Sequence, residues 1–571
     1  MHLSAIAILA LCAAPAAAQQ PNIVMILADD VGTDFVGAYA EGNEIPCTPN
    51  IDALASQGML FRNAWTNTLC SPSRASLLTG RYAFRHGIGV TLLKTEPGLA
   101  LSEVTLPEVL TGYTSAALGK WHLSGDQGPL HPNDSGFAEY RGSLYGAVED
   151  YFAWTKTING VQSSWTTYAV TDTIDDAVAA VGTLPEPWFV YVSLNAIHDP
   201  FHIPPAALCP GGCEPGYCQN ISSRPSTPNQ ARAMMEAMDT EVGRLLTAVG
   251  VQDPNAFVVF MGDNGTYGPL SVPPFEANHG KGTMYEGGIG VPLIVKGPGV
   301  EIAQCGALVS STDLYATFAE LAGVPSEAED SVSLVPYFSA PAQPSLRKSV
   351  YTERFFPNHG WPKQDHQQAI RGRRFKLIRI LGQPDQFFDL VLDPFETTNL
   401  SPELTPSQKF AYDELVAELD ALLAGAPQNY CTAGTSASGC QAAIGTYGIP
   451  SASSTSGFDL RVSGMEGQKD GIFFFGSDGR QANPWGSGTS YQCVAPRVKR
   501  AGFLAGTGNA GQCDGSAQQD LNAIWCASCP QPWKNPGAGA TVQAQFWYRD
   551  PQNTSNQTTS LSDAVEFVLE P

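Results

Sequence analysis

Basic residues are scarce in this chain. Lys and Arg number 31 against 54 Asp and Glu, which gives a formal net charge of −23 over 571 residues. Such a charge repels a polyphosphate backbone unless a local basic patch intervenes. We therefore expect no nucleic acid among the partners, although an acidic surface can attract cations.

Long uninterrupted apolar runs are also lacking. The first 20 residues hold one short apolar run followed by Ala16, Ala17 and Ala18, a small-residue pattern typical of a signal-peptide cleavage site. This pattern predicts a signal peptide over residues 1–18 and export to the periplasm or the extracellular space, even though Lys and Arg are missing from its first residues. No later run reaches the length of a transmembrane helix, so we expect no stable membrane insertion.

The composition excludes global disorder. Hydrophobic residues make up 43% and aromatic residues 10% of the chain, which is enough to bury an extensive core. The length exceeds that of one ordinary domain and favours two or three.

Cysteine is unevenly distributed. Of the 13 cysteines, six lie between residues 431 and 529 and three between residues 209 and 218. In an exported chain they predict several disulfides, whose pairing the spacing does not reveal. Cys526 and Cys529 have a spacing found in redox sites, zinc sites and disulfides; without a second ligand pair, we favour a structural disulfide.

Three apolar runs predict buried parallel strands at residues 22–28, 188–194 and 256–261. Polar residues follow each run: Asp29 and Asp30, then His198, then Asp263 and Asn264. Because ligand sites gather at the carboxyl ends of parallel strands, these side chains are expected to converge. Segments such as 229–249 have the pattern of covering helices, so an α/β sandwich is the predicted fold.

The pattern changes after about residue 345. Residues 369–379 and 386–390 predict short antiparallel strands, and a helix is expected to begin at Thr405 and Pro406 and to end before Gly425. This helix is expected to close the catalytic unit, residues 19–425. Residues 426–457 are interpreted as a linker, and residues 458–571 as a separate, Cys-containing, β-rich accessory domain.

The most specific segment is Cys70-Ser-Pro-Ser-Arg-Ala-Ser-Leu-Leu-Thr-Gly-Arg81. It resembles the signature Cys-x-Pro-Ser-Arg-x-x-x-Leu-Thr-Gly-Arg of the formylglycine-dependent type I sulfatases, an arylsulfatase-like family of the alkaline phosphatase superfamily. The resemblance implies that Cys70 is oxidised to formylglycine (3-oxoalanine) by a maturation enzyme and then supplies the nucleophilic oxygen. A lone cysteine in an exported protein is more often buried or disulfide-bonded, and the whole motif favours the functional interpretation.

Further segments resemble sulfatase motifs in the expected order along residues 21–425. They are Pro21 to Gly32, Gly119-Lys120-Trp121-His122-Leu123, His198, Asp263-Asn264, and Gly280-Lys281 to Gly288. The resemblance implies an alkaline-phosphatase-like sandwich with a central, mostly parallel sheet and a small C-terminal antiparallel subdomain. The β-rich domain would be additional.

The resemblance also implies a role for each basic residue. Arg74, four residues after Cys70, would hold the nucleophile and the metal site. Lys120 and Lys281 would bind sulfate, His198 would protonate the leaving oxygen, and His122 would deprotonate the second hydroxyl of the hydrated aldehyde to expel sulfate. Each residue considered singly is more often structural, and the matching motifs reverse that preference.

A metal site is expected from Asp29, Asp30, Asp263 and Asn264, with residue 70 as a further ligand implied by the resemblance. Carboxylate and amide oxygens suit calcium or magnesium better than zinc. The resemblance favours Ca²⁺. Alone, each pair could be an ordinary turn at a strand end.

One departure from the family pattern is Gly290, where many relatives have Arg. Three functions remain open: a sulfatase acting on aryl or carbohydrate sulfate esters, a formylglycine-dependent phosphonate or phosphodiester hydrolase, and a catalytically silent exported binding protein. The residues from Phe355 to His366 are candidates for the wall that contacts the alcohol, and the Trp and Tyr content of the last domain permits carbohydrate binding.

Overall fold

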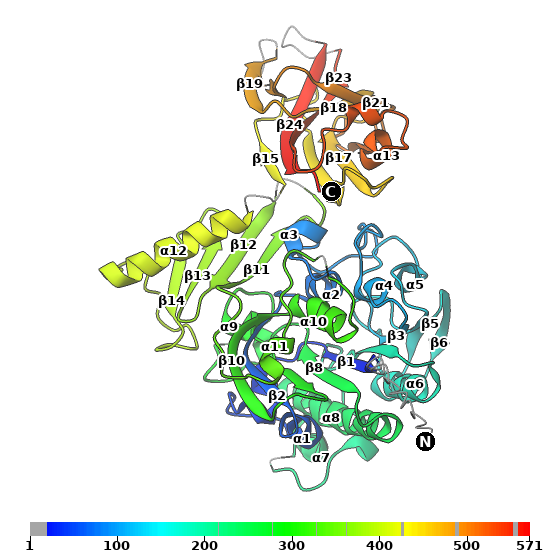
Figure 1. Cartoon of the computed structure of the whole chain (residues 1–571), viewed down its shortest axis with the longest axis vertical. Coiled ribbons are helices and arrows are strands. Elements are labelled where there is room, and N and C mark those ends of the chain that lie inside the picture. Colours follow the sequence, from blue (N-terminus) through cyan, green and yellow to red (C-terminus); the bar gives the residue numbers. More distant parts are fainter. Residues whose placement is uncertain are drawn as a thin grey trace, which may run out of the picture.

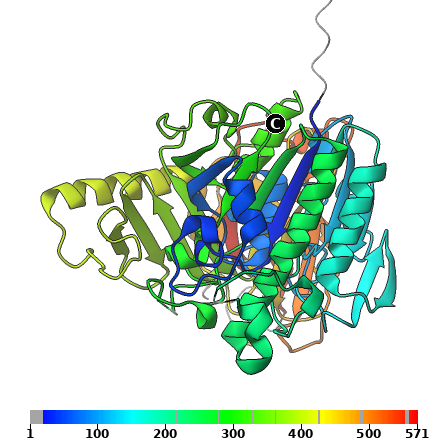
Figure 2. The ribbon, with the colours of Figure 1, turned by 90° about the horizontal axis from the view of Figure 1, so that it is seen from below.

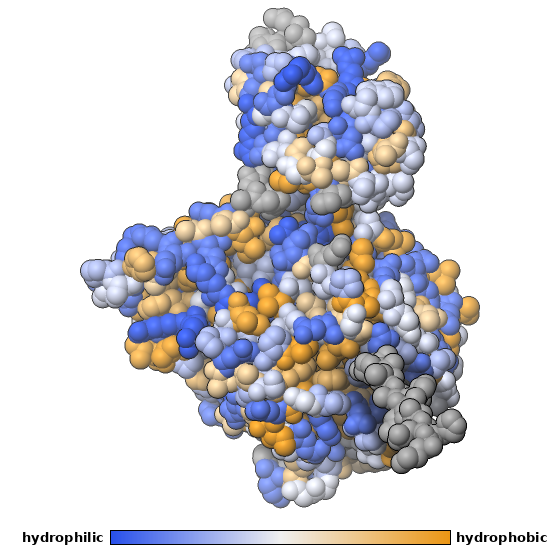
Figure 3. Space-filling model, viewed as in Figure 1, coloured by the Kyte–Doolittle hydropathy of each residue, from blue (hydrophilic) through white to orange (hydrophobic). Residues whose placement is uncertain are grey.

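The computed structural model describes residues 20–570 except 215, 277, 327, 361–362, 424–426, 486–489 and 552–557. The segment 1–18, expected to be a signal peptide, lies outside the described residues. A larger α/β unit and a smaller β-rich unit give the molecule a two-lobed outline (Figure 1, Figure 3). Within the described residues, no helix combines the length and the apolar character that a bilayer crossing needs.

A ten-stranded sheet forms the centre of the α/β unit. In sheet order its strands are β10 (Ala303–Ser310), β2 (Met59–Trp65), β9 (Leu293–Lys296), β8 (Phe257–Gly262), β1 (Ile23–Ala28), β7 (Trp188–Ser193), β3 (Thr114–Gly119), β4 (Glu139–Gly142), β5 (Trp154–Ile158) and β6 (Val161–Trp165). The pairs around β1 are parallel, whereas β9, β5 and β6 run antiparallel to their neighbours. The predicted mostly parallel sheet is confirmed.

Helices cover both faces of this sheet because its central strands are apolar on both sides. Val24 and Ile26 belong to one core, and Ile23 and Met25 to the other. The first core lies beneath α1 (Pro49–Ala55), α6 (Ala169–Thr183) and α8 (Thr227–Gln252). The second lies beneath α2 (Cys70–Thr79), α4 (Leu106–Val109), α10 (Asp313–Leu321) and α11 (Val335–Phe338). Figure 2 shows α6 and α8 side by side along the sheet.

Four short helices lie in the connections of this unit: α3 (Ala83–His86), α5 (His131–Asp134), α7 (Tyr217–Asn220) and α9 (Glu286–Ile289). A separate antiparallel sheet follows, with strands β11 (Val350–Phe356), β12 (Gln364–Arg371), β13 (Phe375–Ile380) and β14 (Gln386–Asp389). Helix α12 (Pro406–Leu423) packs Leu415 and Leu419 onto it. The antiparallel subdomain and its closing helix are thus confirmed.

The β-rich unit begins earlier than the predicted boundary at residue 458. Strands β15 (Gln428–Tyr430) and β16 (Ala443–Gly448), within the expected linker 426–457, pair with β24 and β17 of this unit. Its other strands are β17 (Phe458–Met465), β18 (Gly471–Gly476), β19 (Arg480–Pro484), β20 (Tyr491–Val494), β21 (Lys499–Leu504), β22 (Gly515–Asp520), β23 (Thr541–Arg549) and β24 (Thr559–Val568), with helix α13 (Asn522–Trp525). Residues 443–448 are few and alternate only weakly, so their sequence did not predict a strand. Pairing with β17 stabilises the strand there.

Five disulfides occur among the described residues. They join Cys47 to Cys213, Cys209 to Cys218, Cys431 to Cys493, Cys440 to Cys513, and Cys526 to Cys529. The expected structural disulfide at Cys526 and Cys529 is therefore present. Cys70 and Cys305 are buried free thiols.

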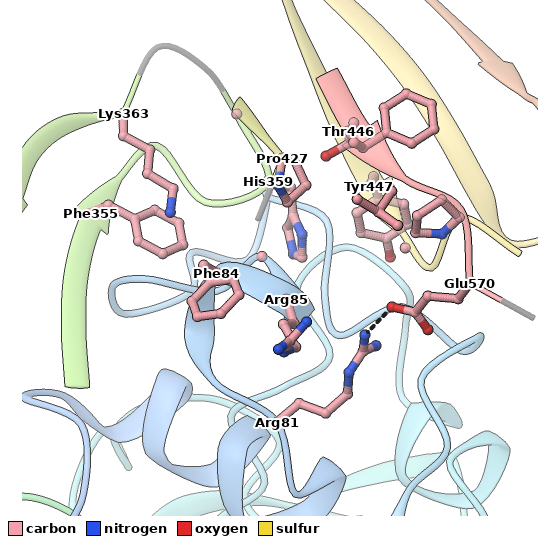
Figure 4. Close-up of a pocket in the computed structure, with 16 residues that line it drawn as sticks. Arg81, Phe84, Arg85, Phe355, His359, Lys363, Pro427, Thr446, Tyr447 and Glu570 are labelled. Carbon is pink, nitrogen blue, oxygen red and sulfur yellow. Dashed lines mark hydrogen bonds and ion pairs between the residues drawn. The ribbon is translucent and has the colours of Figure 1, made fainter. Parts of the chain in front are cut away.

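The two units meet at a small cavity of about 50 Å³. At this contact Arg81, the last residue of the Cys70 motif, pairs with Glu570 of the β-rich unit at 2.8 Å (Figure 4). The Tyr447 hydroxyl accepts from Gln127 Nε2 at 3.1 Å and donates to the carbonyl oxygen of Gly98 at 3.2 Å. The Tyr447 ring lies edge-on to His359, with their centroids 4.6 Å apart.

Candidate active site

The carboxyl ends of β1, β7 and β8 lie side by side, as the strand pattern predicts. The Asp263 amide donates to the carbonyl oxygen of Ala28 at 2.9 Å, and the Ile197 amide donates to that of Asp29 at 2.7 Å. Asp30, which has a φ of 63°, turns the chain after β1, and its amide donates to Asp263 Oδ1 at 3.1 Å. These bonds bring residues more than 160 positions apart in the sequence into one place.

Three of the expected metal ligands form a buried acidic cluster. Asp29, Asp30 and Asp263 each offer a carboxylate oxygen, and these oxygens lie within 4.8 Å of one another. Asn264 lies beside them and donates from Nδ2 to Asp30 Oδ1 at 2.9 Å. Asp29 Oδ1 and Asn264 Oδ1 are buried without a hydrogen-bond partner among the described residues. A buried acceptor left in this way is costly, so the donor set fits a hard divalent cation.

Three cations surround the acidic cluster. Arg74 Nη2 lies 2.8 Å from Asp263 Oδ2, and Lys120 Nζ lies 2.6 Å from Asp29 Oδ2. Lys281 Nζ lies 2.5 Å from Asp30 Oδ1. Three carboxylates therefore face three cations, and a bound divalent ion would make the site net positive.

Burial and the neighbouring cations together set the pKa values of the three aspartates. Burial raises the pKa of Asp30, but Lys281, His198 and Lys120 together outweigh burial and hold that pKa below its ordinary value. Burial likewise raises the pKa of Asp263, and Arg74, Lys120 and Lys281 together reverse the shift, so that this pKa is also lowered. For Asp29 burial prevails over Lys120, so its pKa is raised.

Cys70 is the first residue of α2 and is 1% exposed. Burial raises the pKa of its thiol, but Lys120 and Lys281 outweigh this effect and lower the pKa below its ordinary value. The amino end of the helix favours negative charge at the same position. The local electrostatics therefore stabilise an anionic atom on residue 70.

His122 contacts Cys70 directly. Its Nδ1 lies 3.2 Å from Cys70 Sγ, and its Nε2 lies 3.2 Å from the carbonyl oxygen of Leu92. Burial lowers the pKa of His122 well below its ordinary value, so the ring is neutral. Because a carbonyl oxygen only accepts, the Leu92 contact places the proton on Nε2 and leaves Nδ1 as an acceptor facing residue 70.

His198 lies at the more open side of the site, with 17% of its side chain exposed. Its Nδ1 lies 3.1 Å from Asp199 Oδ1. Burial lowers its pKa, while Asp30 opposes the shift. The structure thus gathers all the basic residues singled out in the sequence around Cys70 and the acidic cluster.

Several supporting residues were not predicted. The Tyr151 hydroxyl contacts the carbonyl oxygens of Asn195 and His198 at 2.6 and 2.8 Å and fixes the turn after β7. Ser71 Oγ donates to the carbonyl oxygen of His122 at 3.1 Å and accepts from the Leu92 amide at 3.0 Å. Tyr151 belongs to no motif, and its distance from residue 198 in the sequence hides its role.

The residues from Phe355 to His366 were expected to form the wall that contacts the alcohol. Phe355 is 1% exposed and packs beneath Lys363 rather than lining the surface, whereas Arg354 Nη1 donates at 2.9 Å to the carbonyl oxygen of Gly282, next to Lys281. Trp361 and Pro362 lie outside the described residues.

At the family's Arg position, Gly290, no side chain is available to pair with Glu286. Arg371 and Lys376 instead approach Glu286 to 3.0 Å each. The departure from the family pattern therefore leaves the Glu286 carboxylate paired.

Two protein-family models match the α/β unit and the antiparallel subdomain. The model of the family described as Sulfatase matches residues 21–324, and that of N-sulphoglucosamine sulphohydrolase, C-terminal, matches residues 277–425. Residues 426–571 lie outside both matches.

Human arylsulfatase A is 30% identical over 498 residues, which cover 74% of this chain and 92% of that protein. Rat N-acetylgalactosamine-6-sulfatase is 31% identical over 379 residues, which cover 58% of this chain and 68% of that protein. The crystal structure of Ps i-CgsB in complex with k-i-k-neocarrahexaose shares 29% identity and a TM-score of 0.61, covering 71% of this chain and 93% of that one.

Proposed function

Because this chain belongs to the sulfatase family, whose members are sulfuric ester hydrolases, we propose that it releases inorganic sulfate from sulfate esters of carbohydrate or aryl alcohols. The proposal includes formylglycine at position 70 and calcium in the acidic cluster. One observation carries it: Cys70 lies at the amino end of α2, in contact with His122 and within the field of Lys120 and Lys281.

Position 70 is suited to a nucleophile. Formylglycine, as its hydrated aldehyde, supplies an oxygen nucleophile that splits the reaction into two accessible steps. The Cys70 side chain is buried, so the nucleophile is shielded from bulk water. His122 Nδ1 is an acceptor at 3.2 Å from Cys70 Sγ, whose place a hydroxyl oxygen of the hydrated formylglycine would take, and we assign His122 the removal of a proton there.

Lys120 and Lys281 are assigned to the sulfate. Their ammonium groups already lie at 2.6 and 2.5 Å from carboxylates, so each is fixed in place before the substrate arrives. Fixed charges stabilise the developing anion without reorganisation. His198, on the open side, is assigned to the proton of the leaving oxygen; an anionic ester beside it would raise its pKa and favour the protonated form.

Asp29, Asp30, Asp263 and Asn264 would hold the divalent ion, with residue 70 completing the ligand set. The buried, unsatisfied oxygens of Asp29 and Asn264, beside the clustered carboxylates of Asp30 and Asp263, support this assignment. When bound, calcium would polarise a sulfate oxygen and orient the nucleophile. Arg74 positions the cluster because it contacts Asp263 and, through Nη1, the carbonyl oxygen of Lys120 at 3.0 Å.

Export and enzymatic maturation complete the proposal. Five disulfides among the described residues support an oxidising compartment. We infer that a formylglycine-generating enzyme modifies Cys70 before the chain folds, because the thiol is buried afterwards.

Matched substrates test the reaction class. Protein coexpressed with a formylglycine-generating enzyme is assayed for initial rates with an aryl sulfate and the corresponding phosphate monoester, phosphodiester and phosphonate, and then with sulfated sugars. We expect the highest kcat/KM for a sulfate ester, since a phosphate monoester can carry an additional negative charge in the same pocket. Efficient phosphodiester or phosphonate hydrolysis with negligible sulfate release from every sulfate ester would overturn the proposal.

A further inference from the structure

The β-rich unit carries a groove that the proposed reaction does not use. It has a volume of about 310 Å³ and lies on the outer face of the sheet formed by β18, β21 and β23. Its lining includes Phe474, Trp485, Gln492, Arg500, Phe503 and Trp547. Both family matches end before this unit, at residue 425 or earlier.

Strand register builds an aromatic row along this groove. Ile472 on β18 lies opposite Trp547 on β23 and opposite Phe503 on β21. Side chains opposite one another on paired strands lie about 5 Å apart, so Trp547, Ile472 and Phe503 form one continuous apolar row. We call it the aromatic row after its two outer members. Phe503 is 68% exposed, which is unusual for a large apolar side chain.

The main core of this unit lies on the inner face of the sheet, whereas the outer face carries a smaller buried cluster of Phe474, Val494 and Leu561. Phe473 and Phe475 alternate with Ile472 and Phe474 on β18 and fill the core on the inner face of the sheet. Trp485 and Trp547 pack only partly, beside Phe474 on the outer face. The outer face therefore leaves aromatic surface open to solvent.

A cation lies beside the aromatic row. Arg500 on β21 is opposite Phe474 and is exposed, and its guanidinium makes no hydrogen bond or ion pair within the part of the chain that is described. By contrast, Arg497 lies 2.6 Å from Asp478, and Arg480 lies 2.6 Å from Glu566.

We propose that this groove binds a segment of a sulfated glycan and so holds a polymeric substrate beside the catalytic unit. A sugar ring offers a C–H face for the aromatic row, hydroxyl groups for the Gln492 amide, and a sulfate for the planar fork of Arg500. A hollow of this volume suits a small ligand segment better than a flat protein interface. The sulfated character of the glycan rests on the proposed function and on the charge of Arg500.

Binding at two places on one chain raises the effective concentration of the polymer at the catalytic unit. The gain exists only for substrates long enough to reach both sites. A small aryl sulfate cannot reach both sites at once, so its turnover measures the chemistry without any gain from the groove.

Affinity electrophoresis tests the groove directly. The Cys70→Ala protein, which cannot desulfate the probe, is run in gels cast with carrageenan, chondroitin sulfate or heparin, and with their desulfated forms. We expect retardation by at least one sulfated polymer. Trp547→Ala and Arg500→Gln, each added to the same background, should weaken its affinity at least about tenfold. Trp533→Ala, at another exposed tryptophan, and Arg497→Gln, with the same change of charge, serve as matched controls.

Equal retardation of the groove variants and their controls, or no retardation by any sulfated polymer, would overturn the proposal. Arg500→Gln and Phe503→Ser change exposed side chains, so they keep the test valid if Trp547→Ala fails to fold. If size-exclusion chromatography shows that Trp547→Ala converts a dimer into a monomer and no glycan binds, the groove is a contact between copies of this chain. The same groove substitutions in protein that keeps Cys70 are assayed for aryl sulfate turnover, which tests the proposed catalytic function. Glycan binding is measured with the catalytically inactive Cys70→Ala protein, so the two proposals can fail independently.

Discussion

Cys70 differs in its surroundings from Cys305, the other free cysteine of the described chain. Burial raises the pKa of the Cys305 thiol, whereas Lys120 and Lys281 lower that of Cys70 despite equally low exposure. The difference lies in fixed charges supplied by two distant segments. At the scale of single residues, the cations placed around Cys70 therefore distinguish it from an ordinary buried cysteine.

The acidic cluster gives a prediction about metal content. Asp263→Asn removes one of three clustered carboxylates, so the purified variant should lose most of its calcium while remaining folded. Metal analysis after dialysis measures this loss. Asp239→Asn, at a buried aspartate that accepts from the amides of Asn50 and Ile51, is the control and should keep its metal. Full metal content and activity in Asp263→Asn would refute the assignment.

Glu353 gives a prediction about pH. Burial raises its pKa, but Lys363 at 3.2 Å and His366 at 2.9 Å outweigh burial and lower the pKa from 4.5 to about 2. Because the folded state binds this proton less readily than the unfolded chain, the stabilisation is complete above about pH 4.5 and is lost as the pH falls toward 2.

Glu353→Gln should therefore lower the free energy of unfolding at pH 7 by about 3 kcal/mol and flatten its decline between pH 5 and pH 3. Denaturant unfolding at several pH values measures both effects. An unchanged slope in the variant would show that Glu353 does not carry this dependence.

At the scale of elements, α2 must end where Gly80 turns the chain. Gly80 has a φ of +68°, and a Cβ there would lie 2.7 Å from the Cβ of Ala328 and 2.8 Å from Tyr315. Gly323 has the same φ, but no atom of the described residues lies within 4 Å of its would-be Cβ. Comparing substitutions at the two glycines therefore distinguishes the cost of backbone strain from that of a steric clash.

Gly80→Ala should lower the melting temperature more than Gly323→Ala. Both substitutions pay about 1–2 kcal/mol for a left-handed conformation, and only the first adds the clash. Thermal unfolding of the two variants measures the difference. Equal losses would mean that the region around Gly80 relaxes without cost.

Sequence patterns predicted the elements whose signal is local. The apolar runs that became β1, β7 and β8 are long and end in polar residues, and the leucines of α12 repeat at helical spacing. The sequence did not predict strand β16 because its local pattern is weak and the strand depends on pairing with β17. The sequence also did not predict the role of Tyr151 or the contacts of Arg371 and Lys376 with Glu286. These contacts join segments that are distant in the sequence.

At the scale of the whole molecule, the β-rich unit braces the loops around the active site. Tyr447 binds Gly98 and Gln127, and Gln127 also donates to the carbonyl oxygen of Leu99 at 3.1 Å. The Leu99 amide in turn donates to the carbonyl oxygen of Leu123, the residue after His122, at 2.9 Å. A chain of hydrogen bonds therefore links the two units to His122.

Tyr447→Phe should reduce kcat several-fold with little change in KM, since it removes two hydrogen bonds worth about 1 kcal/mol each while keeping the ring. Tyr430→Phe is the control because, as far as the chain is described, its hydroxyl bonds only within the β-rich unit, to the carbonyl oxygen of Cys493 at 2.9 Å. Steady-state kinetics with an aryl sulfate decide the question. Equal kcat values in both variants would show that the brace does not reach the active site.

The most direct test measures how activity depends on the state of residue 70. Preparations with different degrees of maturation are digested, and the fraction of aldehyde in the peptide containing Cys70 is determined by mass spectrometry beside the specific activity toward an aryl sulfate. We predict that activity is proportional to the aldehyde fraction and nearly absent in Cys70→Ala. Full activity in a preparation whose Cys70 is entirely thiol would contradict the account.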